Sequence, residues 1–188
     1  PYDESVGYEL PDEEADVVTM SHGHHDHNYH DWVKGNPEIV NKLGSFYVKD
    51  IPIRGIHSYH DEVQGEKRGA NIIYCMEIDG IHVCHCGDLG HVLTPDQVKE
   101  IGVVDLLLLP VGGTYTIDGA AAAKVAAQLK PRCIIPMHFK TPAAQLPIQG
   151  VEPFLDLMGG GEYLHRNHLV LNPEDLGEQT RVVVLDYE

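Results

Sequence analysis

The chain has 188 residues, enough for a single domain with a buried core; 43% of them are hydrophobic and 22% are charged. We therefore expect one domain over residues 1–188. The formal net charge of −16 repels phosphate backbones and argues against a nucleic-acid partner. No apolar run reaches the roughly 18 residues of a membrane-spanning helix, so no membrane partner is expected. The four cysteines form no CxxC pair, which favours a reduced, cytoplasmic protein.

Strands dominate the first half of the predicted secondary structure. A short helix is expected around residues 29–34. Two β-rich runs, 71–78 and 81–86, flank Asp79-Gly80, and this dipeptide is a strong signal of a two-residue hairpin turn. Further extended segments are expected at residues 15–20, 39–40, 46–48 and 51–59.

Helices alternate with strands in the second half. The segment 94–97 reads as a capping box that begins a helix, and this helix stops at Gly102. Asp118 can cap a second helix that runs through Leu129, and a third is expected over 153–158. Further strands are expected at residues 103–110, 133–136, 169–171 and 182–185. A first half rich in strands, followed by a second half in which helices and strands alternate, predicts an α/β fold with two sheets between helices.

A metal-binding loop follows the first predicted strand. The segment His22-Gly23-His24-His25-Asp26-His27 places four imidazoles and a carboxylate within six residues. Imidazole nitrogen and carboxylate oxygen are the ligands that suit zinc and its first-row neighbours. A purification tag would be terminal and uninterrupted, and a metal-sequestering tract would repeat. The context therefore predicts a folded metal site.

The remaining ligands are expected at other strand ends on the same rim. A catalytic metal keeps a coordination position open, and a two-metal site needs more ligands than one loop supplies. Three polar side chains emerge from apolar strands in this way. They are His60, Asp88 and His138.

These motifs resemble the signature of the metallo-β-lactamase superfamily, which is H-x-H-x-D-H followed by a distant His, a Gly-Asp pair and a final His. More narrowly, three phrases resemble the branch of zinc-dependent hydrolases that includes the L-ascorbate-6-phosphate lactonases. The phrases are Arg68-Gly69-Ala70-Asn71, His85-Cys86-Gly87-Asp88-Leu89-Gly90-His91 and Val111-Gly112-Gly113-Thr114-Tyr115-Thr116.

The resemblance implies two divalent metal ions, with Zn²⁺ favoured and Mn²⁺, Fe²⁺ or Ni²⁺ suited to the same donors. It implies that one ion is bound by His22, His24 and His60, the second by Asp26, His27 and His138, and that Asp88 bridges them. We favour His60 over the nearby His57, since the family motif places the ligand directly before the residue that is Asp61 here.

The resemblance also implies an αββα sandwich. Family members usually begin with a β-hairpin ahead of an Asp-Pro-aromatic phrase, and Pro1-Tyr2 resembles the end of that phrase. We therefore expect the family fold without its usual N-terminal hairpin. All seven expected ligands lie within the present sequence.

The function expected from the resemblance is hydrolysis of a small, possibly anionic substrate. A metal-bound hydroxide, oriented by Asp26 as the catalytic residue, would attack a carbonyl or phosphoryl centre of a lactone, ester or phosphodiester. Tentative substrate contacts are Thr114, Tyr115, Lys140 and His91. The alternatives are a non-enzymatic metal-binding or sensing protein and a nuclease-type phosphodiesterase. Flavodiiron redox chemistry is disfavoured, because His25 occupies the position where that relative needs a carboxylate.

Overall fold

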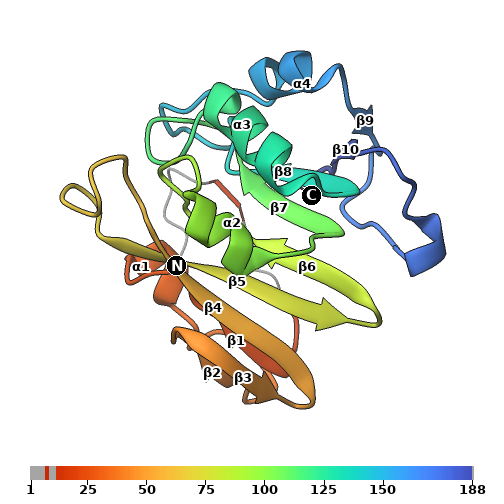
Figure 1. Cartoon of the computed structure of the whole chain (residues 1–188). Coiled ribbons are helices and arrows are strands. Elements are labelled where there is room, and N and C mark those ends of the chain that lie inside the picture. Colours follow the sequence, from red (N-terminus) through yellow and green to blue (C-terminus); the bar gives the residue numbers. More distant parts are fainter. Residues whose placement is uncertain (1–6, 9–11, 188) are drawn as a thin grey trace.

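The computed structural model describes residues 7–8 and 12–187. The expected remnant of the family's N-terminal phrase, Pro1-Tyr2, lies outside the described residues. Figure 1 traces the chain from the small sheet near the start to the strands and loops at its end.

The described strands form two sheets. The small sheet pairs β1 (Val17–Thr19) with β2 (Glu38–Val40) in parallel. The large sheet has the order β3-β4-β5-β6-β7-β8-β10-β9, antiparallel from β3 to β6 and parallel from β6 onwards. Its strands are β3 (Gly44–Val48), β4 (Ile51–Tyr59), β5 (Ala70–Ile78), β6 (Ile81–His85), β7 (Leu106–Pro110), β8 (Cys133–Met137), β9 (Glu162–Tyr163) and β10 (Arg181–Val184).

The helices are short and begin where the sequence provides caps. The Thr94 hydroxyl accepts a hydrogen bond from the backbone N–H of Gln97, and the Gln97 side-chain oxygen accepts one from the backbone N–H of Thr94, so the expected capping box forms. Asp118 accepts from the N–H of Ala121 at 2.9 Å. The helices are α1 (His25–Asn28), α2 (Pro95–Ile101), α3 (Gly119–Leu129) and α4 (Glu152–Met158), with a 3₁₀ turn at Pro173–Asp175. Within the described ranges, none of them is long and apolar enough to cross a membrane.

The main core lies between the large sheet and the helices that cover one of its faces (Figure 1). Leu107 and Ile134 from the parallel strands are fully buried against Val125 of α3 and Phe154 of α4. The small residues of α3 let it pack closely on α4, where a Cβ atom at Gly119 would lie 2.9 Å from the backbone N of Phe154.

A second core joins the small sheet to the first strands of the large one. It contains Val40 of β2, Val48 of β3, Ile53 of β4 and Tyr74 of β5. The Tyr74 hydroxyl lies 3.1 Å from the backbone carbonyl oxygens of Met20 and Val40, and burial raises its pKa to about 12. The protein thus has the expected pair of sheets, with helices outside the larger one.

Two sequence predictions of secondary structure are wrong. Residues 29–34 form no helix, because Lys34 is drawn into a bridge with Glu14 and its carbonyl accepts from Ala15 N at 3.0 Å. The helical turn lies earlier instead, at α1 within the histidine loop. Residues 169–171 form no strand, and the short edge strand in this part of the chain is β9.

We predict that Tyr74→Phe lowers the free energy of unfolding by about 1–2 kcal/mol, because a buried carbonyl between the sheets loses its donor. Urea denaturation measures this change. The matched control is Tyr47→Phe, since Tyr47 is 76% exposed and should tolerate the change. Equal stability of Tyr74→Phe and wild type would show that the hydroxyl does not tie the sheets together.

Candidate metal centre

The candidate site lies at one edge of the large sheet. Strands β4 and β6 both run antiparallel to β5, and β8 runs parallel to β6 through β7, so β4, β6 and β8 end at the same edge. His60 and His138 directly follow β4 and β8, and Asp88 follows β6 by three residues. His22 arrives from the small sheet, three residues after β1. The topology therefore gathers residues that are far apart in the sequence.

The Asp88 carboxylate is the centre of the cluster. Asp88 is only 5% exposed, and its Oδ2 atom is surrounded by imidazole Nε2 atoms from four separate positions in the chain. The Oδ2–Nε2 distances are 3.3 Å to His60, 3.4 Å to His27, 3.8 Å to His138 and 3.9 Å to His22. One carboxylate oxygen thus contacts side chains of both expected ligand sets.

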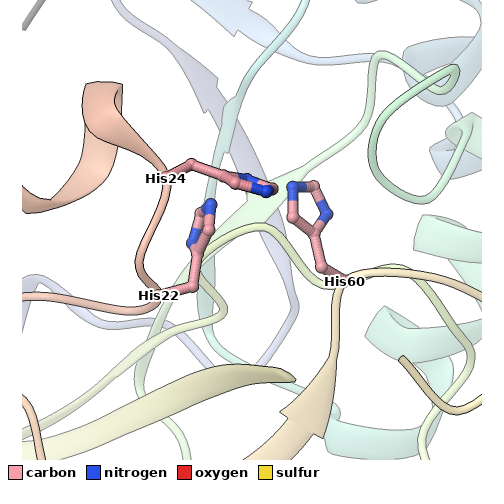
Figure 2. A group of neighbouring side chains, drawn as sticks. All are labelled: His22, His24 and His60. Atoms are coloured by element: carbon pink, nitrogen blue, oxygen red, sulfur yellow. The ribbon is translucent and has the colours of Figure 1, made fainter. Parts of the chain in front are cut away.

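Two groups of side chains have the spacing of metal ligands. Figure 2 shows the rings of His22, His24 and His60 converging from the loop after β1 and the end of β4. One potential ligand atom from each of these three lies within 4.8 Å of the others, and the same holds for His22, His27 and Asp88. Asp26 is exposed at the side of the cluster, with Oδ2 3.8 Å from His27 Nε2.

The His22 ring is left with a buried nitrogen that suits a cation. Its Nδ1 atom lies 2.9 Å from Ser21 Oγ, while Nε2 is buried with no hydrogen-bond partner in the part of the chain that the structure describes. Such an orphaned nitrogen is costly unless it binds something. Burial, helped by the neighbouring His27, lowers the pKa of His22 to about 4, and burial also lowers the pKa of His60. Neutral imidazoles are the form that binds metals, so these residues fit a metal ion.

The backbone that carries the ligands is packed closely and partly strained. A Cβ atom at Gly90 would lie 2.3 Å from the carbonyl carbon of His60, and one at Gly112 would lie 2.1 Å from the carbonyl oxygen of His138. His138 itself has φ of +54°, which is uncommon for a residue with a side chain. Tight neighbours therefore hold two ligands in place.

Asp61 organises the loop that follows the ligand His60. Its carboxylate accepts four backbone N–H bonds at 2.7–3.0 Å, and although its desolvation acts to raise the pKa, these bonds outweigh it and lower the pKa to about 2. The donors are Val63, Gly65, Lys67 and Arg68. From the sequence, Asp61 was only a marker of the family motif, and a carboxylate followed by a glycine-containing loop is the signal that could have revealed this role.

Asn71 is a buried residue that sequence reasoning did not assign to the site. Its side-chain oxygen accepts from the Asp88 N–H at 3.0 Å, and its NH₂ group donates to the Cys86 carbonyl at 2.9 Å and to Ser58 Oγ at 2.8 Å. Asn71 therefore binds the turn that carries Asp88 at two backbone positions, the Cys86 carbonyl and the Asp88 N–H. An amide next to the apolar run that begins at Ile72 was the available signal.

The four expected substrate contacts have different positions. Thr114 Oγ1 donates to the Pro147 carbonyl and Lys140 Nζ to the Leu146 carbonyl, so both brace the loop that follows His138. His91 accepts from Tyr59 N at 3.2 Å, which ties it to the end of β4. Tyr115 alone of the four lies against a ligand ring: its centroid is 6.5 Å from that of His138.

The structure also distinguishes the candidate ligands from the nearby histidines His57 and His25, which are exposed. His57 is exposed on β4, with its ring against Tyr59, while His60 is 3% exposed and contacts Asp88. His25 is exposed on α1, and its ring packs near Tyr29 at 5.5 Å between centroids. Neither His57 nor His25 has a described contact with Asp88.

Comparisons with known proteins identify the family of the chain. Residues 1–138 match the model of the beta-lactamase superfamily domain. A UPF0173 metal-dependent hydrolase of Thermococcus onnurineus is 31% identical over 175 residues, which cover 78% of this chain and 75% of the relative. A crystal structure from Thermotoga maritima, described as that of a Zn-dependent hydrolase of the metallo-beta-lactamase superfamily, matches with a TM-score of 0.81 and 43% identity. The match covers 94% of this chain and 84% of that one.

A structure of a metal-dependent hydrolase from Parabacteroides distasonis shares the fold, with a TM-score of 0.63 at 20% identity, over 93% of this chain and 78% of that one. The chain belongs to the metallo-β-lactamase superfamily, and the expected fold class is confirmed. Within the superfamily it is a metal-dependent hydrolase, as its relatives are named.

We predict that the metal-free protein loses stability as the pH falls from about 6.5 to about 4. The folded-state pKa of His22 is about 4, against 6.5 for an ordinary histidine, so in this interval the unfolded chain binds a proton that the folded chain does not. The free energy of unfolding is therefore highest above this pH interval and falls on acidification. The contribution of His22 to this loss is on the order of 3 kcal/mol. His60 acts in the same direction.

Urea denaturation of the chelator-treated protein at several pH values measures this slope. The control is His22→Gln, which cannot titrate and should show a smaller slope between pH 4 and 6.5. An identical slope in wild type and His22→Gln would contradict the assignment.

Proposed function

We propose that the protein is a binuclear hydrolase of the branch that includes the L-ascorbate-6-phosphate lactonases. One divalent ion would be held by His22, His24 and His60, and the other by Asp26, His27 and His138, with Asp88 between them. Zn²⁺ is the favoured ion, since histidine and carboxylate donors suit it and the Thermotoga maritima relative is described as Zn-dependent.

The observation that carries the proposal is the position of Asp88 among four imidazoles, all within 3.9 Å of one carboxylate oxygen. A closed structural zinc site needs four ligands. Seven candidate ligands, Asp88 included, exceed that need and match the demand of two ions. A carboxylate shared in this way must be aimed accurately, which is the role of the Asn71 side chain.

When bound, two neighbouring divalent ions lower the pKa of water and stabilise the negative charge that develops on an attacked carbonyl oxygen. The protein contributes orientation. Asp26 is exposed beside the cluster, so its carboxylate can accept a hydrogen bond from the water that attacks the substrate. In the hydrolysis of an ester or lactone, a bond forms from the water oxygen to the carbonyl carbon. The bond to the leaving oxygen breaks, and that oxygen takes up a proton to give an acid and an alcohol.

A small carbonyl compound is the favoured substrate. The formal charge of −16 disfavours an extended phosphate polymer, and the centre lies at a sheet edge that a small molecule can reach. A small phosphodiester remains chemically compatible with the same ions and is the comparison compound for the substrate panel.

We predict that Asp26→Ala lowers kcat for lactone or ester hydrolysis by about 10²-fold or more, since the attacking water loses its orienting carboxylate. Steady-state rates with the metal-loaded protein measure the effect. His25→Ala is the control, because His25 is the neighbouring exposed residue of the same turn and lies outside both ligand groups. Wild-type turnover in Asp26→Ala would remove Asp26 from the mechanism.

A further inference from the structure

A cavity of about 610 Å³ opens beside the ligands proposed for the second ion. His27, Asp88 and His138 form one side of it. Its size is that of a small-molecule site. Its lining also includes the apolar side chains of Trp32, Met137, Phe139, Leu146 and Ile148, which we call the apolar wall.

Hydrogen bonds hold this wall in place. The Trp32 indole donates to the Tyr29 carbonyl at 2.9 Å, which fixes the ring. The loop that carries Leu146 and Ile148 is closed at its base by a bond from Lys140 N to Gln149 O at 2.7 Å. Lys140 Nζ and Thr114 Oγ1 bind two carbonyls of the same loop. The apolar side chains are therefore presented by a braced segment.

Away from the proposed metal ions, the charged side chains of the cavity oppose an anionic group. Its described lining contains no lysine or arginine, whereas Asp26, Asp88 and Asp186 are all part of it. Lys140 lies close in sequence, but its ammonium group is bound to the Leu146 carbonyl and is not part of the lining. A phosphate in the apolar part of this cavity would lose water without gaining a cation.

We propose that this cavity binds the apolar acyl, alkyl or aryl portion of an uncharged ester or lactone whose carbonyl faces the metal ligands. The proposal rests on the hydrolase function above and adds the substrate class to it. It distinguishes the proposed substrate from a phosphorylated lactone, since the group beside the carbonyl is apolar here. Burial of alkyl carbons against the wall then provides much of the binding.

Tryptophan fluorescence tests the binding without any turnover. Trp32 is the only tryptophan of the chain and lies in the wall, so its emission reports directly on the cavity. We would titrate the full chain, as purified, with 2-pentylcyclopentanone and with cyclopentanone, two ketones that cannot be hydrolysed. The pentyl ketone should give a saturable change at a concentration at least about tenfold lower, since each buried methylene favours binding.

Variants of the braced loop locate the binding site. Leu146→Asp places a charge in the wall and should weaken pentyl-ketone binding by more than about tenfold. Gln145→Asp is the matched control, since Gln145 is the exposed neighbour and is not part of the lining, and it should bind as wild type does. If circular dichroism shows that Leu146→Asp is unfolded, Leu146→Ala serves instead, with a smaller loss in the same direction.

Hydrolysis of γ-nonalactone and γ-butyrolactone by the Zn²⁺-loaded protein tests the cavity proposal separately from the proposed hydrolase function. Saturable ketone binding with a higher kcat/KM for γ-nonalactone supports both. Turnover of both lactones at equal kcat/KM, with no preference for the pentyl ketone, overturns the cavity proposal and leaves the hydrolase standing. Ketone binding that Leu146→Asp abolishes, without turnover of any lactone or ester, supports the apolar cavity and overturns the proposed reaction.

Discussion

The contact of the Asp88 carboxylate with four imidazole rings is the interaction on which the site depends. A buried carboxylate needs compensation for the water it loses, and neutral imidazoles compensate only in part. Burial lowers the pKa of His22 to about 4 and also lowers the pKa of His60, so these two rings remain metal-binding bases and do not become cations beside the aspartate. The cluster is therefore an arrangement of electron-pair donors with too little positive charge of its own, which is the electrostatic condition that a bound cation satisfies.

Hydrogen bonds and close packing restrain the backbone around this cluster. Asn71 fixes the turn of Asp88, and Asp61 ties the loop after His60 with four backbone bonds. His138 is held at a positive φ angle, with Gly112 against its carbonyl. Such costs are typical of functional sites, where the surrounding packing determines a geometry that the local chain would not choose.

The candidate ligands could be proposed from the sequence because each either sits in one dense loop or emerges at the end of an apolar strand. Strand ends that share an edge bring His60, Asp88 and His138 together whatever the connecting loops do. The residues whose hydrogen bonds hold the loops around the site could not be predicted in the same way. Thr114 and Lys140 stay predicted substrate contacts, but in the structure they also bind backbone carbonyls of one surface loop, and no sequence pattern marks such acceptors.

The secondary structure likewise contains elements that the local sequence predicts and one that it does not. The Asp79-Gly80 hairpin and the capped helices depend on local chemistry and were predicted, whereas the helical turn of α1 depends on the site. His25 to Asn28 contains poor helix formers with no side-chain cap, so propensity alone gave no signal for it. The turn places Asp26 and His27 on the side of the cluster and leaves His25 exposed.

The measurement that tests the account most directly is the metal content of wild type and of Asp88→Ala after equal loading with Zn²⁺ and removal of excess ion. If Asp88 joins two ligand sets, wild type should retain two ions per chain, and Asp88→Ala should retain less than one while keeping its fold by circular dichroism. Full wild-type occupancy in Asp88→Ala would contradict the central role of this carboxylate.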